Sequence, residues 1–192
     1  ESLGEPVPSF VDVPIIQAQP VSADTPLNGL STPTIDGKAD DGEWAKAAVY
    51  TQEDGTPLAG FEVTLDNENL YIKANAAQNA AMPAKVGIYV LSPKTAYPNS
   101  FTVAAEGEKA ALLNFAVSYA FLWDGGDTLA AYAAGADGWR SADTAAVGSA
   151  AASGKVLETA IPLSIFGKLG SGDDLRLAVV AQPANQVIPA GG

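Results

Sequence analysis

Residues 35–182 alternate short runs of β-forming residues with Gly, Asp and Asn turns, about every ten residues. The clearest two runs, FEVTLD and LYIKAN, flank the polar turn DNEN, whose Asp and Asn residues suit a tight hairpin connection. Apolar side chains recur at every second position of both runs, at Phe61, Val63, Leu65, Leu70 and Ile72. This pattern predicts an all-β fold, an antiparallel, jelly-roll-like β-sandwich of about nine to eleven strands.

The same pattern places the individual elements. We expect strands near 58–65, 69–75, 85–91, 100–105, 114–122, 127–133, 155–161 and 174–181. The Ala-rich runs TLAAYAAGA and VGSAAASG would favour helix by propensity, but closely spaced glycines bound the first run, and we interpret both as strands. One helical turn is expected in PLSIFGKLG, which begins at Pro162 and ends at Gly167 or Gly170.

Composition excludes several classes of function. The 192 residues contain no cysteine and no histidine, which removes thiolate chemistry, the commonest general base and the commonest transition-metal ligand. A net charge of −12 opposes binding to nucleic acid. The sequence contains no apolar run of about 18 residues that could span a membrane. The cofactor chemistry that remains is oxygen-ligand binding of a cation such as calcium.

The first 34 residues differ from the rest of the chain, with six prolines and no lysine or arginine. We predict three parts: a Pro-rich extended segment (1–34), a β-sandwich domain (35–182) and a short tail (183–192). SFVDVPIIQAQPV is typical of an apolar strand that pairs along one edge only, because its prolines lack a backbone donor. Its candidate assembly residues are Phe10, Val11, Val13, Ile15 and Ile16. The strand could pair with its own sandwich or complete the sheet of a neighbour.

The acidic stretch IDGKADDGEW does not fit the spacing of an EF-hand calcium loop. Asp36, Asp40 and Asp41 remain candidates for a looser calcium site. The favoured interpretation is a turn at the start of the sandwich, with Trp44 in the core and a partner for its indole N–H.

IDGKADDGEWAKAAVY, followed by FEVTLDNENLYIKANA, resembles the opening of domains related to family 9 carbohydrate-binding modules. The segments KVGIYVLSP, ETAIPLSIFG and SGDDLRLAVVA are similar to the C-terminal accessory sandwich of amylopullulanases and glucodextranases. The resemblance covers about residues 33–182 and implies a secreted, non-catalytic module for sugar binding or surface attachment. A haem-binding relative, the gamma subunit of ethylbenzene dehydrogenase, uses Met and Lys ligands; Met82 and Lys85 are a weak match, since the chain has no second Met and no His.

A sugar site needs exposed aromatic platforms with polar neighbours. The carbohydrate-binding candidates are Trp123, Trp139, Tyr97, Asp124 and Arg140. We expect no catalytic residue and no enzyme activity, because the acids cluster in turns and no base is present to activate a serine.

Two functions follow from these observations. The first is a non-catalytic structural subunit, extracellular or at the cell surface, that assembles with itself by donating its N-terminal strand. The alternative is a polysaccharide-binding module, of α-glucan type, in a secreted amylolytic or cell-surface protein. The start at Glu1 rather than Met fits a processed chain and, with the resemblance, suggests export. No cofactor is required under either function, although calcium could bridge acidic subunits.

Overall fold

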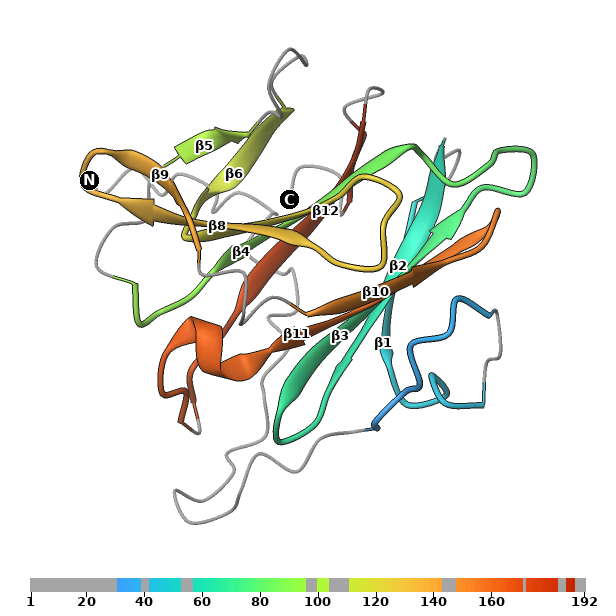
Figure 1. Cartoon of the computed structure of the whole chain (residues 1–192), viewed down its shortest axis with the longest axis horizontal. Coiled ribbons are helices and arrows are strands. Elements are labelled where there is room, and N and C mark those ends of the chain that lie inside the picture. The colour runs from blue at the N-terminus through green and yellow to red at the C-terminus, as the bar shows by residue number, and fades with distance from the viewer. Residues whose placement is uncertain are drawn as a thin grey trace, which may run out of the picture.

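A computed structural model describes residues 31–38, 42–52, 57–95, 100–103, 111–142, 148–170, 172–182 and 186–188. The predicted assembly residues Phe10, Val11, Val13, Ile15 and Ile16 lie outside this part of the chain. The fold is an antiparallel β-sandwich, as the sequence predicted, with two large sheets packed face to face (Figure 1). No helix in the described part is long and apolar enough to cross a membrane.

One layer is a five-stranded sheet in the order β1-β2-β3-β11-β10. Its strands are β1 (Ala48–Thr51), β2 (Leu58–Leu65), β3 (Asn69–Ala76), β11 (Val156–Pro162) and β10 (Ser149–Ala152). The other layer is a six-stranded sheet in the order β13-β12-β4-β7-β8-β9. It contains β13 (Gln186–Ile188), β12 (Arg176–Gln182), β4 (Lys85–Leu91), β7 (Tyr119–Trp123), β8 (Ala130–Gly135) and β9 (Gly138–Ser141).

A two-stranded sheet, β5 (Ser100–Val103) with β6 (Ala111–Val117), covers part of the outer face of the six-stranded sheet. The 3₁₀ turn η3 (Leu163–Phe166) lies in the connection between β11 and β12. It follows Pro162 and ends at Gly167, whose φ of +84° favours glycine, so the predicted helical turn is confirmed.

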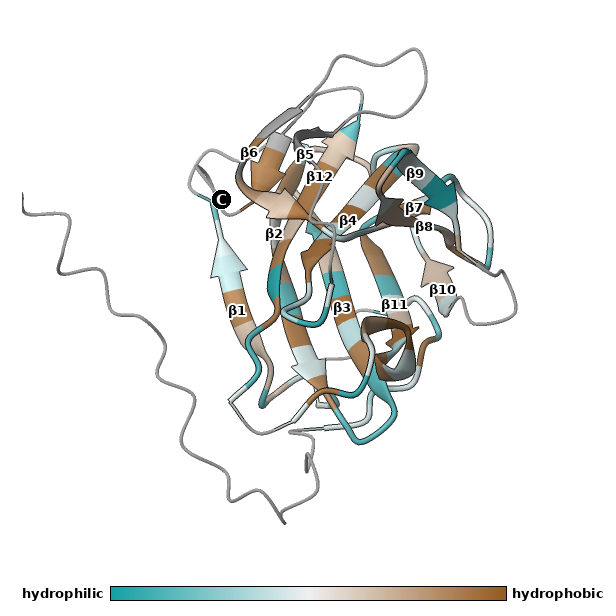
Figure 2. Ribbon diagram, turned by 90° about the vertical axis from the view of Figure 1, so that its left-hand side faces the viewer, coloured by the Kyte–Doolittle hydropathy of each residue, from teal (hydrophilic) through white to brown (hydrophobic). Residues whose placement is uncertain are grey.

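The core forms because alternate residues of both sheets point inward, and Figure 2 shows hydrophobic and polar residues alternating along β2, β3 and β11. Phe61, Leu70 and Ile72 pack from one sheet against residues of the other, including Phe121. The ring of Phe166 meets that of Phe121 edge-on, with 5.9 Å between centroids. The face assigned to the core from FEVTLD and LYIKAN is therefore the inner face.

The predicted strand boundaries were wrong in two respects. The segment expected as a single strand at 114–122 is two strands, β6 and β7, with Ser118 between them. Ser118 is fully buried, and its hydroxyl accepts the N–H of Ser92, so it fixes the turn at which the chain changes layers. The short strands β1, β9 and β13 were not predicted, and β13 falls within the stretch expected as a tail.

The predicted DNEN turn joins β2 to β3. The Asp66 carboxylate accepts the backbone N–H groups of Glu68 and Asn69, both at 2.8 Å, and the Tyr71 hydroxyl at 2.6 Å. Partial burial raises the pKa of Asp66, but these hydrogen bonds outweigh it and leave the pKa below its ordinary value. Burial, followed by the bond to Asp66, raises the pKa of Tyr71 to about 12.

We expect Asp66 to contribute stability that depends on pH. A carboxyl with a lowered folded-state pKa stabilises the fold above its unfolded pKa and loses that contribution as pH falls through the folded pKa. The advantage of the native chain over Asp66→Asn in free energy of unfolding should therefore shrink below about pH 4. Urea unfolding between neutral and acid pH measures it. An advantage independent of pH would contradict the assignment.

Candidate functional site

The segment IDGKADDGEW is attached to the five-stranded sheet by one carboxylate. Glu158, on β11, is 2% exposed and accepts three N–H groups. They are the backbone N–H of Asp36 at 3.1 Å, the backbone N–H of Gly37 at 2.8 Å and the indole N–H of Trp44 at 3.0 Å. Trp44 is 2% exposed on the outer face of the sheet. The predicted partner for its N–H is therefore Glu158.

A second buried charge lies beside this carboxylate. Lys73, on β3, is 1% exposed and stands opposite Glu158 on one side and Glu62 on the other. Its ammonium is 2.8 Å from the Glu62 carboxylate and 5.3 Å from the centre of the Trp44 ring. Charges so deeply buried persist only when they are paired. This cluster of Glu62, Lys73, Glu158 and Trp44 fastens the start of the sandwich to its outer face.

Of the three predicted calcium ligands, the structure describes only Asp36. Asp36 accepts the backbone N–H of Lys38 at 3.0 Å and pairs with its ammonium; hydrogen bonds to Lys38 lower the Asp36 pKa. Asp40 and Asp41 lie outside the described residues. Within the described ranges, no group of three or more acidic side chains could hold a metal ion. Calcium binding stays a prediction.

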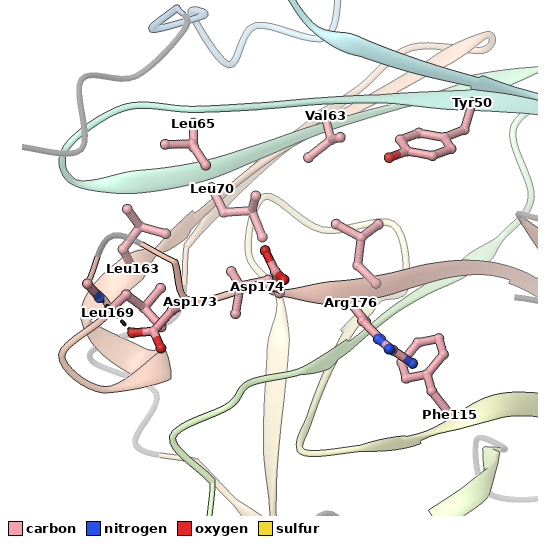
Figure 3. A pocket seen from close by; sticks show the side chains of 13 residues that line it. Tyr50, Val63, Leu65, Leu70, Phe115, Leu163, Leu169, Asp173, Asp174 and Arg176 are labelled. Atoms are coloured by element: carbon pink, nitrogen blue, oxygen red, sulfur yellow. Dashed lines mark hydrogen bonds between the residues drawn. The ribbon is translucent and has the colours of Figure 1, made fainter. Parts of the chain in front are cut away.

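An apolar cleft of about 460 Å³ opens between the two sheets, at the side where β2 and β12 face each other (Figure 3). Its described lining includes Tyr50, Val63, Leu65, Leu70, Phe115, Leu163, Leu169, Leu175 and Leu177. Six of these side chains are only half-buried: Tyr50, Val63, Leu65, Leu169, Leu175 and Leu177. Asp173, Asp174 and Arg176 line the same cleft. An open cleft with a mostly apolar lining and a few charged groups is a candidate binding site.

The aromatic sugar-binding candidates do not form one platform. Trp123 is 7% exposed in the core, and its indole N–H is donated to the carbonyl of Gly126 at 2.7 Å. Trp139 is 38% exposed and pairs with Ala134 at the opposite end of β8. The register places the two tryptophans roughly 17 Å apart along the strands, with side chains on opposite faces.

A smaller pocket of about 420 Å³ lies on the outer face of the six-stranded sheet. Its lining includes Asp124, Lys85, Tyr132 and Gln182. The buried Nε2 of Gln182 has no hydrogen-bond partner in the described part of the chain. Trp139, on the neighbouring strand, shares this face of the sheet. Tyr132 and Gln182 were not among the predicted residues, because in the sequence they resemble ordinary strand positions.

The remaining candidates are dispersed. Arg140 is exposed on β9 and pairs with Asp137 at 2.9 Å. Tyr97 lies outside the described residues. Met82, the weak haem candidate, packs against the hydrophobic core, and Lys85 lines the outer-face pocket.

No family model, curated protein or solved structure matches the chain. The resemblance to family 9 carbohydrate-binding modules therefore stays a prediction from the sequence.

We expect Glu158→Ala to destabilise the sandwich by about 3 kcal/mol or more, because it leaves the N–H groups of Asp36, Gly37 and Trp44 without their acceptor in a buried or partly buried place and removes a negative charge beside the buried Lys73. Thermal and urea unfolding measure the loss. Glu68→Ala is the control, since Glu68 is exposed and its removal should change stability by less than about 0.5 kcal/mol. Equal, small effects of the two substitutions would refute the anchoring role of Glu158.

Proposed function

We propose that the protein is a non-catalytic structural subunit, extracellular or at the cell surface, that assembles with copies of itself by donating its N-terminal strand. The observation that carries this proposal is the open apolar cleft between the sheets. In a closed sandwich the inner faces of the strands are covered, whereas here six large apolar side chains at one place are only partly buried. The chain also carries an apolar strand sequence at residues 9–21, ahead of its sandwich.

The chemistry of the described acids supports a non-catalytic role. Asp66 and Asp173 accept backbone N–H groups in turns, and Asp173 also pairs with Lys94 at 2.8 Å. The hydrogen bonds from Lys94 and then Gly170 hold the pKa of Asp173 below its ordinary value. Carboxylates held ionised in turns are poor general acids. With no histidine or cysteine in the sequence, the usual nucleophile-activating pairs are absent as well.

Charge sets a condition on assembly. Subunits with a net charge of −12 repel one another, and this repulsion weakens as salt or a divalent cation screens it. Calcium therefore stays part of the proposal as a bridging ion, although no cofactor is required for the fold.

The proposal predicts that deletion of residues 1–21 abolishes assembly while the sandwich remains folded. Negative-stain microscopy and sedimentation of the full-length and truncated chains measure it, each with and without a chelator of divalent cations. Filaments or layers that persist after truncation would refute strand donation. Assembly that is unchanged by the chelator would refute the bridging cation and leave strand donation unaffected.

Two matched full-length variants distinguish two causes of lost assembly: disruption of the apolar strand and the addition of negative charge. Val11→Asp with Val13→Asp places two acids in the strand, and Ser22→Asp with Thr25→Asp places two acids in the polar stretch after it. We expect only the first variant to lose assembly. An equal loss of assembly in both variants would show that the added negative charge, and not the damaged strand, prevents assembly.

Polysaccharide binding is the second candidate function. The observation that favours it is the outer-face pocket, where Gln182 lies with Asp124 and the ring of Tyr132. The Nε2 of Gln182 has no hydrogen-bond partner among the described residues. Trp139 adds a half-exposed aromatic surface on the same face. Sugars are bound by this combination of ring faces and hydrogen-bonding groups.

If this face binds α-glucans, Trp139→Ala should weaken retention on starch by about tenfold, because a stacked ring contributes roughly 1–2 kcal/mol. Affinity electrophoresis in gels containing starch measures the retention. Val49→Ala is the control, since Val49 is 62% exposed on β1, in the other sheet. Absence of retention by the native chain, or retention unchanged by Trp139→Ala, would count against this function.

A further inference from the structure

Within the described residues, strand β12 is paired along only part of one edge. It pairs along its whole length with β4, from Arg176 to Gln182. On its other side β13 pairs only with Val179, Val180 and Ala181. No strand of the described part pairs with Arg176–Ala178 on that side. Backbone N–H and C=O groups at such an edge are a template for a further strand.

The apolar cleft wraps around this unpaired stretch. Leu177 lines it from β12 and Leu175 from the residue just before that strand. Val63 and Leu65 line it from β2 in the facing sheet. Phe115 lines it from β6, which packs on the outer side of β12. No β4 residue contributes to its described lining, so the cleft follows the edge of β12 rather than its paired side. A strand laid here would continue the line of β13 and would be covered from both layers.

We infer that this cleft is the acceptor site for strand donation, and that residues 10–16 of a second copy add to the edge of β12. The inference rests on the proposed function and names the site and the partner that it requires. In FVDVPII, Val11, Val13 and Ile15 point to one side of the strand. These three side chains enter the cleft and cover the half-buried leucines of β12 and β2.

The position of Pro14 agrees with this orientation. In a strand, the residues whose backbone faces one neighbour alternate with residues whose backbone faces the other. If Val11, Val13 and Ile15 bond to β12, Pro14 faces away, where its missing N–H costs no ladder hydrogen bond. Asp12 then lies on the outward face, which is also the face of the exposed Arg176. The donor and acceptor strands therefore carry opposite charges on the same face, and we place Asp12 beside Arg176 because that register pairs these charges.

The described part of the chain begins on the outer face of β2, whereas the cleft lies on the inner side of that strand. The hydroxyl of Ser31, at the start of the described part, is donated to that of Thr64 at 3.1 Å. Thr64 pairs with Tyr71 and faces outward on β2, whereas the cleft lies on the inner side of the same strand. The residues between Ile16 and Ser31 span up to roughly 50 Å when extended, which is enough to reach a neighbour.

The four residues of the sequence after β13 differ in composition from the proposed donor strand. Pro189, Ala190, Gly191 and Gly192 have small side chains, and the first lacks a backbone donor. They cannot supply the apolar side chains that a cleft of about 460 Å³ would take.

Paired cysteines in the full-length chain test the site, because the native sequence contains no cysteine. Asp12→Cys with Arg176→Cys places thiols on the two strands at positions expected to be neighbours, within reach of a disulfide. The control is Asp12→Cys with Arg140→Cys, since Arg140 is also exposed but lies on β9, at the opposite edge of the same sheet. Both pairs are oxidised under assembly conditions and separated on non-reducing gels.

We expect a ladder of disulfide-linked multimers from the Arg176 pair and none from the control. A monomer closed by an internal disulfide would show that the chain fills its own cleft, and would overturn donation to a second copy. If both pairs form filaments that depend on residues 1–21 but neither cross-links, the acceptor site is wrong and the proposed function stands. If the native chain never assembles, the proposed function itself fails.

Discussion

The buried carboxylate of Glu158 determines how the sandwich begins. It accepts N–H groups from Asp36, Gly37 and Trp44, and so holds the segment before β1 against the outer face of the five-stranded sheet. Lys73 lies between Glu158 and Glu62 in the strand register, which balances the buried negative charge. Because a buried carboxylate is stable only with such partners, sheet and segment depend on each other. The described part of the acidic opening motif thus serves the fold.

The inner face of the five-stranded sheet borders an open cleft. Trp44 and its neighbours cover part of the outer face of this sheet. The edge of β12, by contrast, is paired over only part of its length by the strands that the structure describes. Half-exposed leucines gather beside that edge, in a cleft that opens between the sheets. An uncovered apolar edge promotes uncontrolled aggregation unless a partner is built into the system. A strand carried by each copy of the chain would be such a partner. It would cover the edge of the next copy, so that ordered assembly replaces aggregation.

Sequence patterns predicted the core better than they predicted the site. Two-residue periodicity was sufficient to assign Phe61, Leu70 and Ile72 to the inner face, because burial on one side of a strand imposes that pattern. The same rule failed at Ser118, where a buried hydroxyl, rather than a Gly or Pro signal, marks the turn between β6 and β7. Trp123 was expected in a binding loop but packs in the core, since a flanking Gly-Asp loop does not reveal which face a strand residue takes. The cleft was not predictable, as it joins residues from β1, β2, β6 and β12 that only tertiary packing brings together.

The most direct measurement is an electron cryomicroscopy reconstruction of the assembled full-length protein. The central claim is that the edge of β12 is completed by a strand from another copy of the chain. We expect continuous density alongside Arg176–Ala178, traceable to residues 10–16 of a neighbouring subunit, with Val11, Val13 and Ile15 facing Leu65 and Leu177. Density that connects this strand to its own sandwich, or subunits joined through other surfaces with the β12 edge empty, would contradict it.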